Sequence, residues 1–337
     1  MNSVILGRTG LKVSRVGFGG IPIQRLGEAE AVRVVQRCLD LGVTFLDTAN
    51  AYSTSESRIG KAISGRREHL VIATKTAGRD RATAEQHLQR SLTRLGCSTI
   101  DLWQFHNVSS LEAYEQVLAP GGAMEAAQAA KRHRLIRHIG ITSHDMGVAL
   151  KAVASGHFET MQFPFNFVSS DPARELVPLA REHNVGFVAM KPLGGGLLSN
   201  ATLALKYLLQ FDNVVPIPGI EQVAEAEEIV RIADGLWALT LQERVELERI
   251  REEVGKRFCR RCEYCQPCPE GVVIPLILNP LSFWKRFPPD QLLTGEYAEM
   301  VQGARDCVQC GQCEEKCPYG LPIREMLVES LEFWDSV

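Results

Sequence analysis

Residues 45–52 read F-L-D-T-A-N-A-Y, and this stretch gives the first indication of both the fold and its chemistry. Its apolar approach, which begins at Val43, is typical of the end of a buried strand. Asp47 stands at the exit of that strand, and Tyr52 follows five residues later on the loop. A carboxylate at a strand end beside a phenol suits proton transfer at the mouth of a barrel enzyme. The alternative is a capped turn in which Asp47 only accepts backbone N–H bonds.

The bulk composition favours a globular protein that binds neither nucleic acid nor membrane. The chain has 337 residues, 45% hydrophobic and 23% charged, so one large domain with an appendage is expected. A formal charge of −3 lacks the basic surplus of a nucleic-acid-binding surface. No apolar run reaches the roughly 18 residues of a membrane span, and the N-terminus lacks the apolar core of a signal peptide. We therefore expect a cytoplasmic protein with reduced thiols.

Strands and helices alternate after a short hairpin around the turn at 7–10. We expect strands ending near 20 and at 45–47, 70–74, 100–105, 136–142, 160–165, 186–190 and 214–217, and helices at 28–41, 56–63, 83–95, 124–132, 147–154, 173–183, 201–210 and 223–232. Eight strand–helix units in about 230 residues predict an α/β protein with a (β/α)8 TIM barrel. An open doubly wound sheet is less favoured because no G-x-G-x-x-G follows the first strand.

Polar and glycine residues gather at the predicted strand exits. The loops at these exits carry the active site in barrels of this kind, so the residues there are site candidates. They are Gly19, Gly20, Asp47, Lys75, His106, Ser143, His144, Gln162, Lys191, Pro218 and Gly219.

These residues resemble the motifs of the aldo-keto reductases over roughly positions 1–235. The stretch F-L-D-T-A-N-A-Y with Glu56 and Gly60, then A-T-K, then Q-F-H-N, occur in the order in which that family carries its catalytic tetrad. The resemblance implies a barrel oxidoreductase that uses a nicotinamide cofactor. It also implies that the catalytic residues are Asp47, Tyr52, Lys75 and His106.

Carbonyl reduction explains why these four side chains would be needed together. Hydride addition creates negative charge on the carbonyl oxygen, so Tyr52 would donate a proton as general acid. The Lys75 ammonium favours the phenolate and would bring the pKa of Tyr52 down from its usual value of about 10. Asp47 would pair with Lys75, and a neutral His106 would hold the carbonyl oxygen. The alternative is an ordinary buried ion pair with Tyr52 and His106 packed nearby.

The resemblance also implies the nicotinamide site. Ser143, Gln162 and His144, which stands where many relatives have Asn, would bind the carboxamide. The glycines of K-P-L-G-G-G would let the backbone approach the pyrophosphate, although ordinary loop glycines are the alternative. The remaining cofactor-binding candidates are Gly20, Lys191, Pro192, Leu193, Gly194, Gly196, Pro218 and Gly219.

The segment after the last strand departs from relatives that prefer NADPH, which usually carry basic residues there. It contains four acids and no cation before Arg231. A carboxylate within reach of a 2′-phosphate repels it by about 1 kcal/mol even in water-like dielectric. We therefore expect NADH to serve at least as well as NADPH, with weak dinucleotide binding as the alternative. The acids are Glu221, Glu225, Glu227 and Glu228.

The ten cysteines divide the chain unevenly. Cys38 and Cys97 stand alone in apolar helical patterns and are expected to be small buried hydrophobes. The other eight lie between positions 259 and 317, which marks a second domain. We expect a barrel at 1–238, and at 239–337 a connector helix and a small, mostly helical iron–sulfur domain. Trp284 and Phe287, between the two cysteine runs, are expected to pack against the clusters.

The two cysteine runs resemble those of bacterial two-cluster ferredoxins. The second is C-x2-C-x2-C-x3-C-P, and the first is one residue shorter before its last cysteine. The resemblance implies two 4Fe–4S clusters in which the fourth ligand of each comes from the other run. One set would be Cys259, Cys262, Cys265 and Cys317, and the other Cys307, Cys310, Cys313 and Cys268. Structural zinc, which favours paired C-x2-C knuckles, is the alternative.

Together these features are similar to aldo-keto reductases with a C-terminal ferredoxin-like domain. The expected function is interconversion of a small carbonyl compound and its alcohol with NAD(P)H, with the clusters exchanging electrons with a redox partner protein. Nicotinamide delivers hydride, whereas each cluster passes single electrons. A structural role or a redox-sensing role is therefore the alternative to electron transfer by the clusters. The competing function is an electron-transfer or sensor protein whose barrel binds a ligand without turnover.

Overall fold

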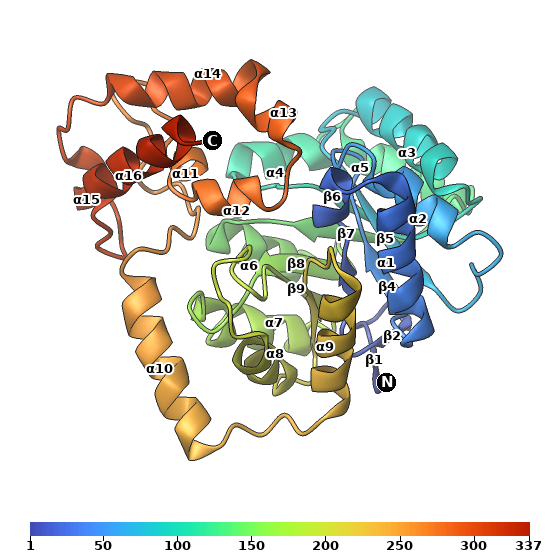
Figure 1. Cartoon of the computed structure of the whole chain (residues 1–337). Helices are drawn as coiled ribbons and strands as arrows, with labels where there is room; N and C mark the ends of the chain where they lie inside the picture. Colours follow the sequence, from blue (N-terminus) through green and yellow to red (C-terminus); the bar gives the residue numbers. More distant parts are fainter.

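The computed structural model describes residues 1–337 and contains a closed barrel of eight parallel strands (Figure 1). The strands are β3 (Phe18–Gly19), β4 (Phe45–Asp47), β5 (Val71–Thr76), β6 (Ile100–Phe105), β7 (Ile136–Thr142), β8 (Thr160–Pro164), β9 (Gly186–Met190) and β10 (Val214–Ile217), each paired with the next. A parallel bridge between Gly19 and Gly219 joins the first strand to the last. The predicted (β/α)8 barrel is therefore confirmed.

Nine helices surround the strands. Helix starts follow capping chemistry: Asp80 accepts the Thr83 N–H at 2.8 Å, and Asp145 accepts that of Val148 at 2.7 Å. The helices are α1 (Glu28–Asp40), α2 (Ser55–Ala62), α3 (Arg81–Leu95), α4 (Leu111–Leu118), α5 (Ala123–Arg132), α6 (Met146–Ala154), α7 (Leu176–Glu182), α8 (Ala201–Leu209) and α9 (Val223–Asp234). Short 3-10 helices, η1 (Pro22–Arg25) and η2 (Asp171–Ala173), follow strands β3 and β8.

The predicted hairpin closes the end of the barrel at which the strands begin. It pairs β1 (Ser3–Ile5) with β2 (Lys12–Ser14), and its turn residue Arg8 donates to the carbonyl oxygen of Phe158 at 2.6 Å. Leu6 and Val13 are buried against residues inside the barrel. The open end must therefore be the one where the strands finish, and this is the end at which the predicted site lies.

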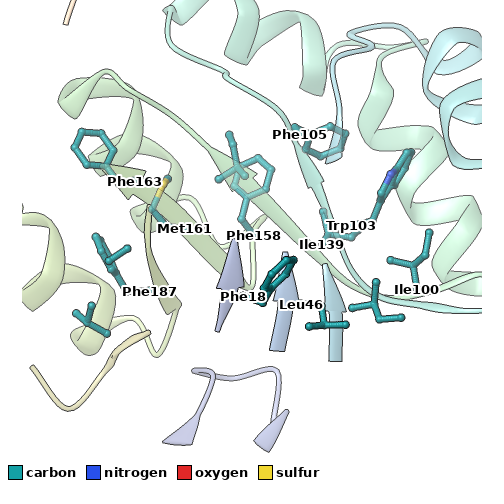
Figure 2. Close-up of a cluster of buried hydrophobic side chains, with 14 of the residues drawn as sticks. Phe18, Leu46, Ile100, Trp103, Phe105, Ile139, Phe158, Met161, Phe163 and Phe187 are labelled. Carbon is teal, nitrogen blue, oxygen red and sulfur yellow. The ribbon is translucent and has the colours of Figure 1, made fainter. Parts of the chain in front are cut away.

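The main core fills the space between the strands and the surrounding helices. Figure 2 shows aromatic and aliphatic side chains of this layer, including Phe18, Trp103, Phe158 and Phe187. These residues are almost completely buried and come from strands and loops far apart in the sequence. Such burial of apolar area is the main term that stabilises the barrel, so the strand ends form a rigid platform for the site.

A separate, mostly helical region follows the barrel and has its own hydrophobic core of 14 buried residues. It begins with α10 (Leu241–Gly255), which runs along the outside of the barrel to the region drawn in orange and red at the top of Figure 1. The rest consists of α11 (Ile274–Ile277), α12 (Pro280–Trp284), α13 (Pro289–Leu293), α14 (Gly295–Gly303), η3 (Ala304–Asp306), α15 (Gln312–Glu315) and α16 (Ile323–Asp335). None of the helices of the chain has the length and hydropathy required to cross a bilayer.

The helical region sits on the open end of the barrel through the glycine loop at 194–196. All three glycines have positive φ, at 59°, 71° and 94°. A Cβ at Gly194 would lie 3.0 Å from the Phe258 ring, and one at Gly196 would lie 2.9 Å from Lys285. Only glycine combines this backbone with so close an approach. The loop that was expected to admit a pyrophosphate thus also seats the helical region.

Candidate active site

A buried ion pair forms the floor of the site. Asp47 ends β4, and the Lys75 ammonium on the neighbouring β5 donates to its Oδ2 at 2.6 Å. The same ammonium donates to the carbonyl oxygen of Thr48 at 2.6 Å, while the Gln104 amide lies 3.3 Å from Oδ1. Both charged side chains are at most 4% exposed. Two acceptors therefore fix the Lys75 ammonium beneath the open end of the barrel, and Gln104 holds the Asp47 carboxylate that is one of them.

Tyr52 and His106 stand above this ion pair. Their rings meet edge to face with centroids 5.6 Å apart, and the Lys75 nitrogen lies 5.1 Å from the centre of the Tyr52 ring. His106 directly follows β6, and its backbone N–H donates to Thr76 at 2.8 Å, which holds the loop against β5. The four side chains named as a tetrad are therefore brought together from three neighbouring strands.

The charge environment favours a protonated phenol. Burial raises the pKa of Tyr52, and the Asp47 carboxylate adds to the shift, while the Lys75 and Arg286 cations oppose it. Burial alone would lower the pKa of Lys75, but the facing Asp47 carboxylate and Tyr52 phenol leave it above its ordinary value. The prediction from sequence considered only the ammonium, whereas desolvation of the phenol is the larger effect here. Tyr52 therefore carries its proton at neutral pH.

His106 is neutral in the folded protein. Burial lowers its pKa to about 3, and the positive charges of Lys75 and Arg79 contribute. A neutral imidazole has one N–H group that can donate to a carbonyl oxygen. Because the pKa of His106 is so low, its imidazole does not take the proton of Tyr52.

We expect the free energy of unfolding to fall as the pH is lowered from about 6.5 towards about 3. Across this window His106 binds a proton in the unfolded chain but not in the folded one, so acid favours unfolding. Urea unfolding at about pH 7 and about pH 5, for the wild type and for His106→Asn, measures the effect. The exposed His133, replaced by Asn, is the control. An unchanged pH slope in His106→Asn would contradict the prediction.

The four side chains line a cleft of about 670 Å³ at the open end of the barrel. This volume is within the usual range for small-molecule sites. The predicted residues that line it are Gly20, Asp47, Tyr52, Lys75, His106, His144, Gln162, Lys191, Pro192, Leu193, Gly196 and Gly219.

Three predicted cofactor-binding residues do not line the cleft. The Ser143 hydroxyl accepts the backbone N–H of Asp145 at 3.0 Å, in the turn before α6. Gly194 packs against the helical region, and Pro218 offers its carbonyl oxygen to the first barrel strand at 2.8 Å. Each of the three is engaged within the protein itself.

One wall of the cleft comes from the C-terminal region, which the sequence analysis did not predict. Arg261, Lys285, Arg286 and Phe287 line it, and all four come from the helical C-terminal region. The Gln24 side chain donates to the carbonyl oxygen of Arg286 at 2.9 Å, tying this wall to the loop after β3. Phe287, which was expected to pack against the clusters, lines the cleft.

The four acids after the last strand have different surroundings. Glu225 completes the N-terminal cap of α9, and Glu227 pairs with Arg37 at 2.7 Å. Glu221 and Glu228 line the cleft. Arg25, from the loop after β3, lies 3.7 Å from Glu221 and brings a cation that is distant in sequence.

Five cysteines of the C-terminal region line a common cavity. They are joined there by apolar residues such as Val272, Ile274 and Leu327. Thiols set in an apolar wall have the donor chemistry that iron–sulfur clusters require, so the residues fit such a group. The five are Cys265, Cys268, Cys307, Cys310 and Cys313.

The remaining thiols gather beside this cavity. Burial raises the pKa of Cys262, and the neighbouring Cys317 thiol adds to the shift. Cys317 thus lies near Cys262 of the first run, while both Cys265 and Cys268 line the cavity of the second run, so the ligand pairing stays a prediction. No three His, Cys, Asp or Glu side chains are grouped closely enough to hold a single metal ion.

Comparison with known proteins identifies both regions. Residues 15–203 match the model of the aldo/keto reductase family, which is more than half of the chain. This chain belongs to the aldo/keto reductase family. Residues 258–322 of this aldo/keto reductase match a 4Fe-4S dicluster domain, so the helical region is an iron–sulfur domain.

Curated relatives and solved structures agree with this assignment. The aldo/keto reductase is 31% identical over 233 residues to the uncharacterized oxidoreductase YrpG of Bacillus subtilis, covering 60% of this chain and 70% of the relative. Its fold matches aldo-keto reductase AKR11C1 from Bacillus halodurans at 26% identity and a TM-score of 0.65, over 74% of this chain and 96% of that one. An aldo-keto reductase from Klebsiella pneumoniae in complex with NADPH, at 20% identity and a TM-score of 0.63, has the same fold over 74% and 94% of the two chains.

Proposed function

We propose that this aldo/keto reductase interconverts a small carbonyl compound and its alcohol with a nicotinamide cofactor. The observation that carries the proposal is the meeting of Tyr52 and His106 over the buried Asp47–Lys75 pair, at the floor of a cleft of about 670 Å³. A lone ion pair would need neither an accessible phenol nor a neutral imidazole beside it.

Each of the four side chains has a separate task in this proposal. Tyr52 donates its hydroxyl proton to the substrate oxygen, and the Lys75 ammonium stabilises the phenolate that remains. Asp47 keeps that ammonium charged and in place. The neutral His106 donates an N–H bond to the same oxygen and so orients the carbonyl. Solvent returns the proton to Tyr52 when the cleft opens.

The cofactor would lie along the side of the cleft formed by the β7, β8 and β9 exits. Gln162 and His144 offer amide and imidazole groups there, and Lys191 with residues 192, 193 and 196 supplies a cation and exposed backbone. A reduced nicotinamide, when bound, supplies the hydride that the carbonyl carbon accepts. We retain Ser143 and Gly194 only as residues that shape these loops and Pro218 as one that shapes the loop after β10, whereas Gly20 and Gly219 line the cleft and remain candidate cofactor contacts.

Titration of the purified protein with NADH and NADPH tests the cofactor. We expect both to bind, with NADH at least as tight, because Glu221 and Glu228 face the cleft near the α9 end. Arg25→Gln should weaken NADPH more than NADH if this cation reaches a 2′-phosphate. Failure of both dinucleotides to bind would overturn the proposed function in favour of an electron-transfer or sensor protein.

We also propose that the eight cysteines hold two 4Fe–4S clusters with the crossed pairing, within a unit at 239–337 that follows a barrel at 1–238. Clusters of this type pass single electrons. Cys268 shares a cavity with the second run, which supports its place in that set; Cys265 lines the same cavity, and the paired substitutions distinguish the two. The exposed Cys310 supports electron exchange with an outside redox partner protein. Reduced thiols of this kind suit the cytoplasm.

Paired substitutions test the crossed ligation. Cys268→Ser should lose about half of the iron in anaerobically purified protein. Adding Cys307→Ser should cause no further loss, because both residues serve one cluster, whereas adding Cys259→Ser should remove the rest. The lone Cys97→Ser is the control. The opposite pattern in the two double variants would show that each run holds its own cluster.

A further inference from the structure

Among the cations that line the cleft, Arg79 and Lys285 donate to backbone carbonyl oxygens, and three others have no acidic partner. They are Lys191 at the exit of β9 and Arg261 and Arg286 from the iron–sulfur domain. None forms an ion pair with an Asp or Glu side chain within 4.0 Å. The only charged carboxylate near Arg261 is the exposed Glu263, two residues further along the chain. Half-buried cations without counterions are costly to keep unless a ligand supplies the negative charge.

Their hydrogen-bonding capacity is also unused. The Arg286 Nε donates to the carbonyl oxygen of Ser282 at 2.6 Å, which leaves its two terminal nitrogens without a protein acceptor. The Arg261 guanidinium has no hydrogen-bond partner in the protein. Lys191 contacts only the Nε2 of His144, at 3.0 Å. Guanidinium groups with free terminal N–H groups match the two oxygens of a carboxylate.

Aromatic packing holds the two guanidinium groups in position. Both lie against the ring of Phe283, with Arg261 at 5.1 Å and Arg286 at 5.3 Å from its centre. Arg286 also lies 6.0 Å from the centre of Phe287. This arrangement places the charges on a fixed wall rather than on mobile surface side chains, so little entropy is lost when an anion binds.

Of the acids that line the cleft, Asp47 and Glu221 have cations beside them and Glu225 caps α9, whereas Glu228 forms no ion pair. Asp47 is paired with Lys75 beneath the floor, and Glu221 has Arg25 beside it. The positive charge of Arg286 reaches Tyr52, since it opposes the burial that raises the pKa of the phenol. Arg286 and Tyr52 therefore line the same cleft, within electrostatic reach of each other.

We propose that the iron–sulfur domain supplies the substrate-anion site of the enzyme, with Arg286, Arg261 and Lys191 binding a carboxylate carried next to the carbonyl group of the substrate. The inference rests on the proposed function and narrows its substrate class to short 2-oxo acids and the matching 2-hydroxy acids. Arg286 is the main specificity residue because it lines the cleft with both terminal nitrogens free and its charge acts on Tyr52.

Two other anions compete for these cations. The pyrophosphate of the cofactor is one, since Lys191 belongs to the loop expected to lie beside it. The iron–sulfur cluster is the other, because Arg261 stands between two cysteines of the first run and interacts with Cys259. Arg286 lies further along the chain than Arg261 from the first cysteine run but lines one small pocket with Cys259, so the iron content of its variant separates the substrate site from the cluster.

The experiment compares pyruvate with its uncharged methyl ester on the anaerobically purified full chain. Calorimetric titration gives the affinity for pyruvate and for NADH, and steady-state kinetics gives kcat and KM for both carbonyl compounds. We expect Arg286→Gln to weaken pyruvate binding between about tenfold and about a hundredfold. It should weaken the use of methyl pyruvate much less than that of pyruvate, and it should change the affinity for NADH and the iron content by less than about twofold. The exposed Arg305→Gln, in the same domain, is the control.

The outcomes separate this inference from the function on which it rests. Equal use of pyruvate and methyl pyruvate, with no effect of Arg286→Gln, would overturn the anion site and leave the reductase intact. An equal loss of NADH affinity would assign the cations to the cofactor and also overturn it. Pyruvate binding that depends on Arg286, without turnover of any carbonyl compound, would uphold the site and reject the reductase.

Discussion

Replacing Tyr52 with phenylalanine should lower kcat by about 10²–10⁴-fold, the usual contribution of a general acid. The substitution removes only the hydroxyl, so the edge-to-face packing on His106 at 5.6 Å is kept. Steady-state turnover of a carbonyl substrate gives kcat, and titration gives the affinity for NADH. We expect the affinity and the iron content to stay at their wild-type values.

Tyr114 provides the matched control, because it is also buried but lies on α4 away from the cleft. Tyr114→Phe should leave kcat unchanged. If Tyr52→Phe kept more than about a tenth of wild-type turnover, the phenol would not be the proton donor and the assignment of the four roles would be wrong.

Replacing Lys75 with methionine should lower the free energy of unfolding by about 3–5 kcal/mol and abolish turnover. The side chain volume is nearly kept, but Asp47 is left as a buried carboxylate without a cation. Denaturant unfolding measures the loss. The double variant Asp47→Asn/Lys75→Met should recover most of the stability, because no uncompensated charge remains, yet it should stay inactive.

The exposed pair of Lys61 and Glu28 is the control for this comparison. Its nitrogen and oxygen are 2.6 Å apart, as close as in the buried pair, but both side chains are more than half exposed. Lys61→Met should therefore have little effect on stability. If Lys75→Met were no more destabilising than Lys61→Met, the buried pair would not have the structural role described here.

The barrel was predictable from sequence because its strands are short, apolar and strongly patterned. β4, β6, β7, β9 and β10 have the predicted bounds, since each is flanked by residues that end a strand. Helix α4 was not predicted, because its eight residues lie in an irregular segment between β6 and α5. The 173–183 helix is divided in the structure, with η2 ahead of α7, since Pro172 and Pro178 limit the regular α-helical hydrogen bonds there.

The site divides in the same way. The meeting of Asp47, Tyr52, Lys75 and His106 follows from local signals, because each stands at or just after a strand end. Arg261 and Arg286 reach the cleft only through the docking of a separate domain, and no pattern in their own neighbourhoods reports that. The helical region showed itself in sequence through its cysteines alone. The glycine loop at 194–196 was the one feature of the barrel sequence related to this docking. Its glycines suit both an approach to a pyrophosphate, as predicted, and the contact with the helical region.

Phe287 and Arg286 belong to the wall of the cleft that the iron–sulfur domain supplies, whereas the four proposed catalytic residues belong to the barrel. The Asp47–Lys75 pair is held by the barrel, whereas this wall belongs to the domain whose cysteines are proposed to hold iron. Loss of the proposed clusters to oxygen should therefore loosen this wall and weaken substrate binding, whichever part the clusters have in the reaction. Exposure to air would then lower activity by disturbing the shape of the cleft, even without a change in the redox state of the reacting groups.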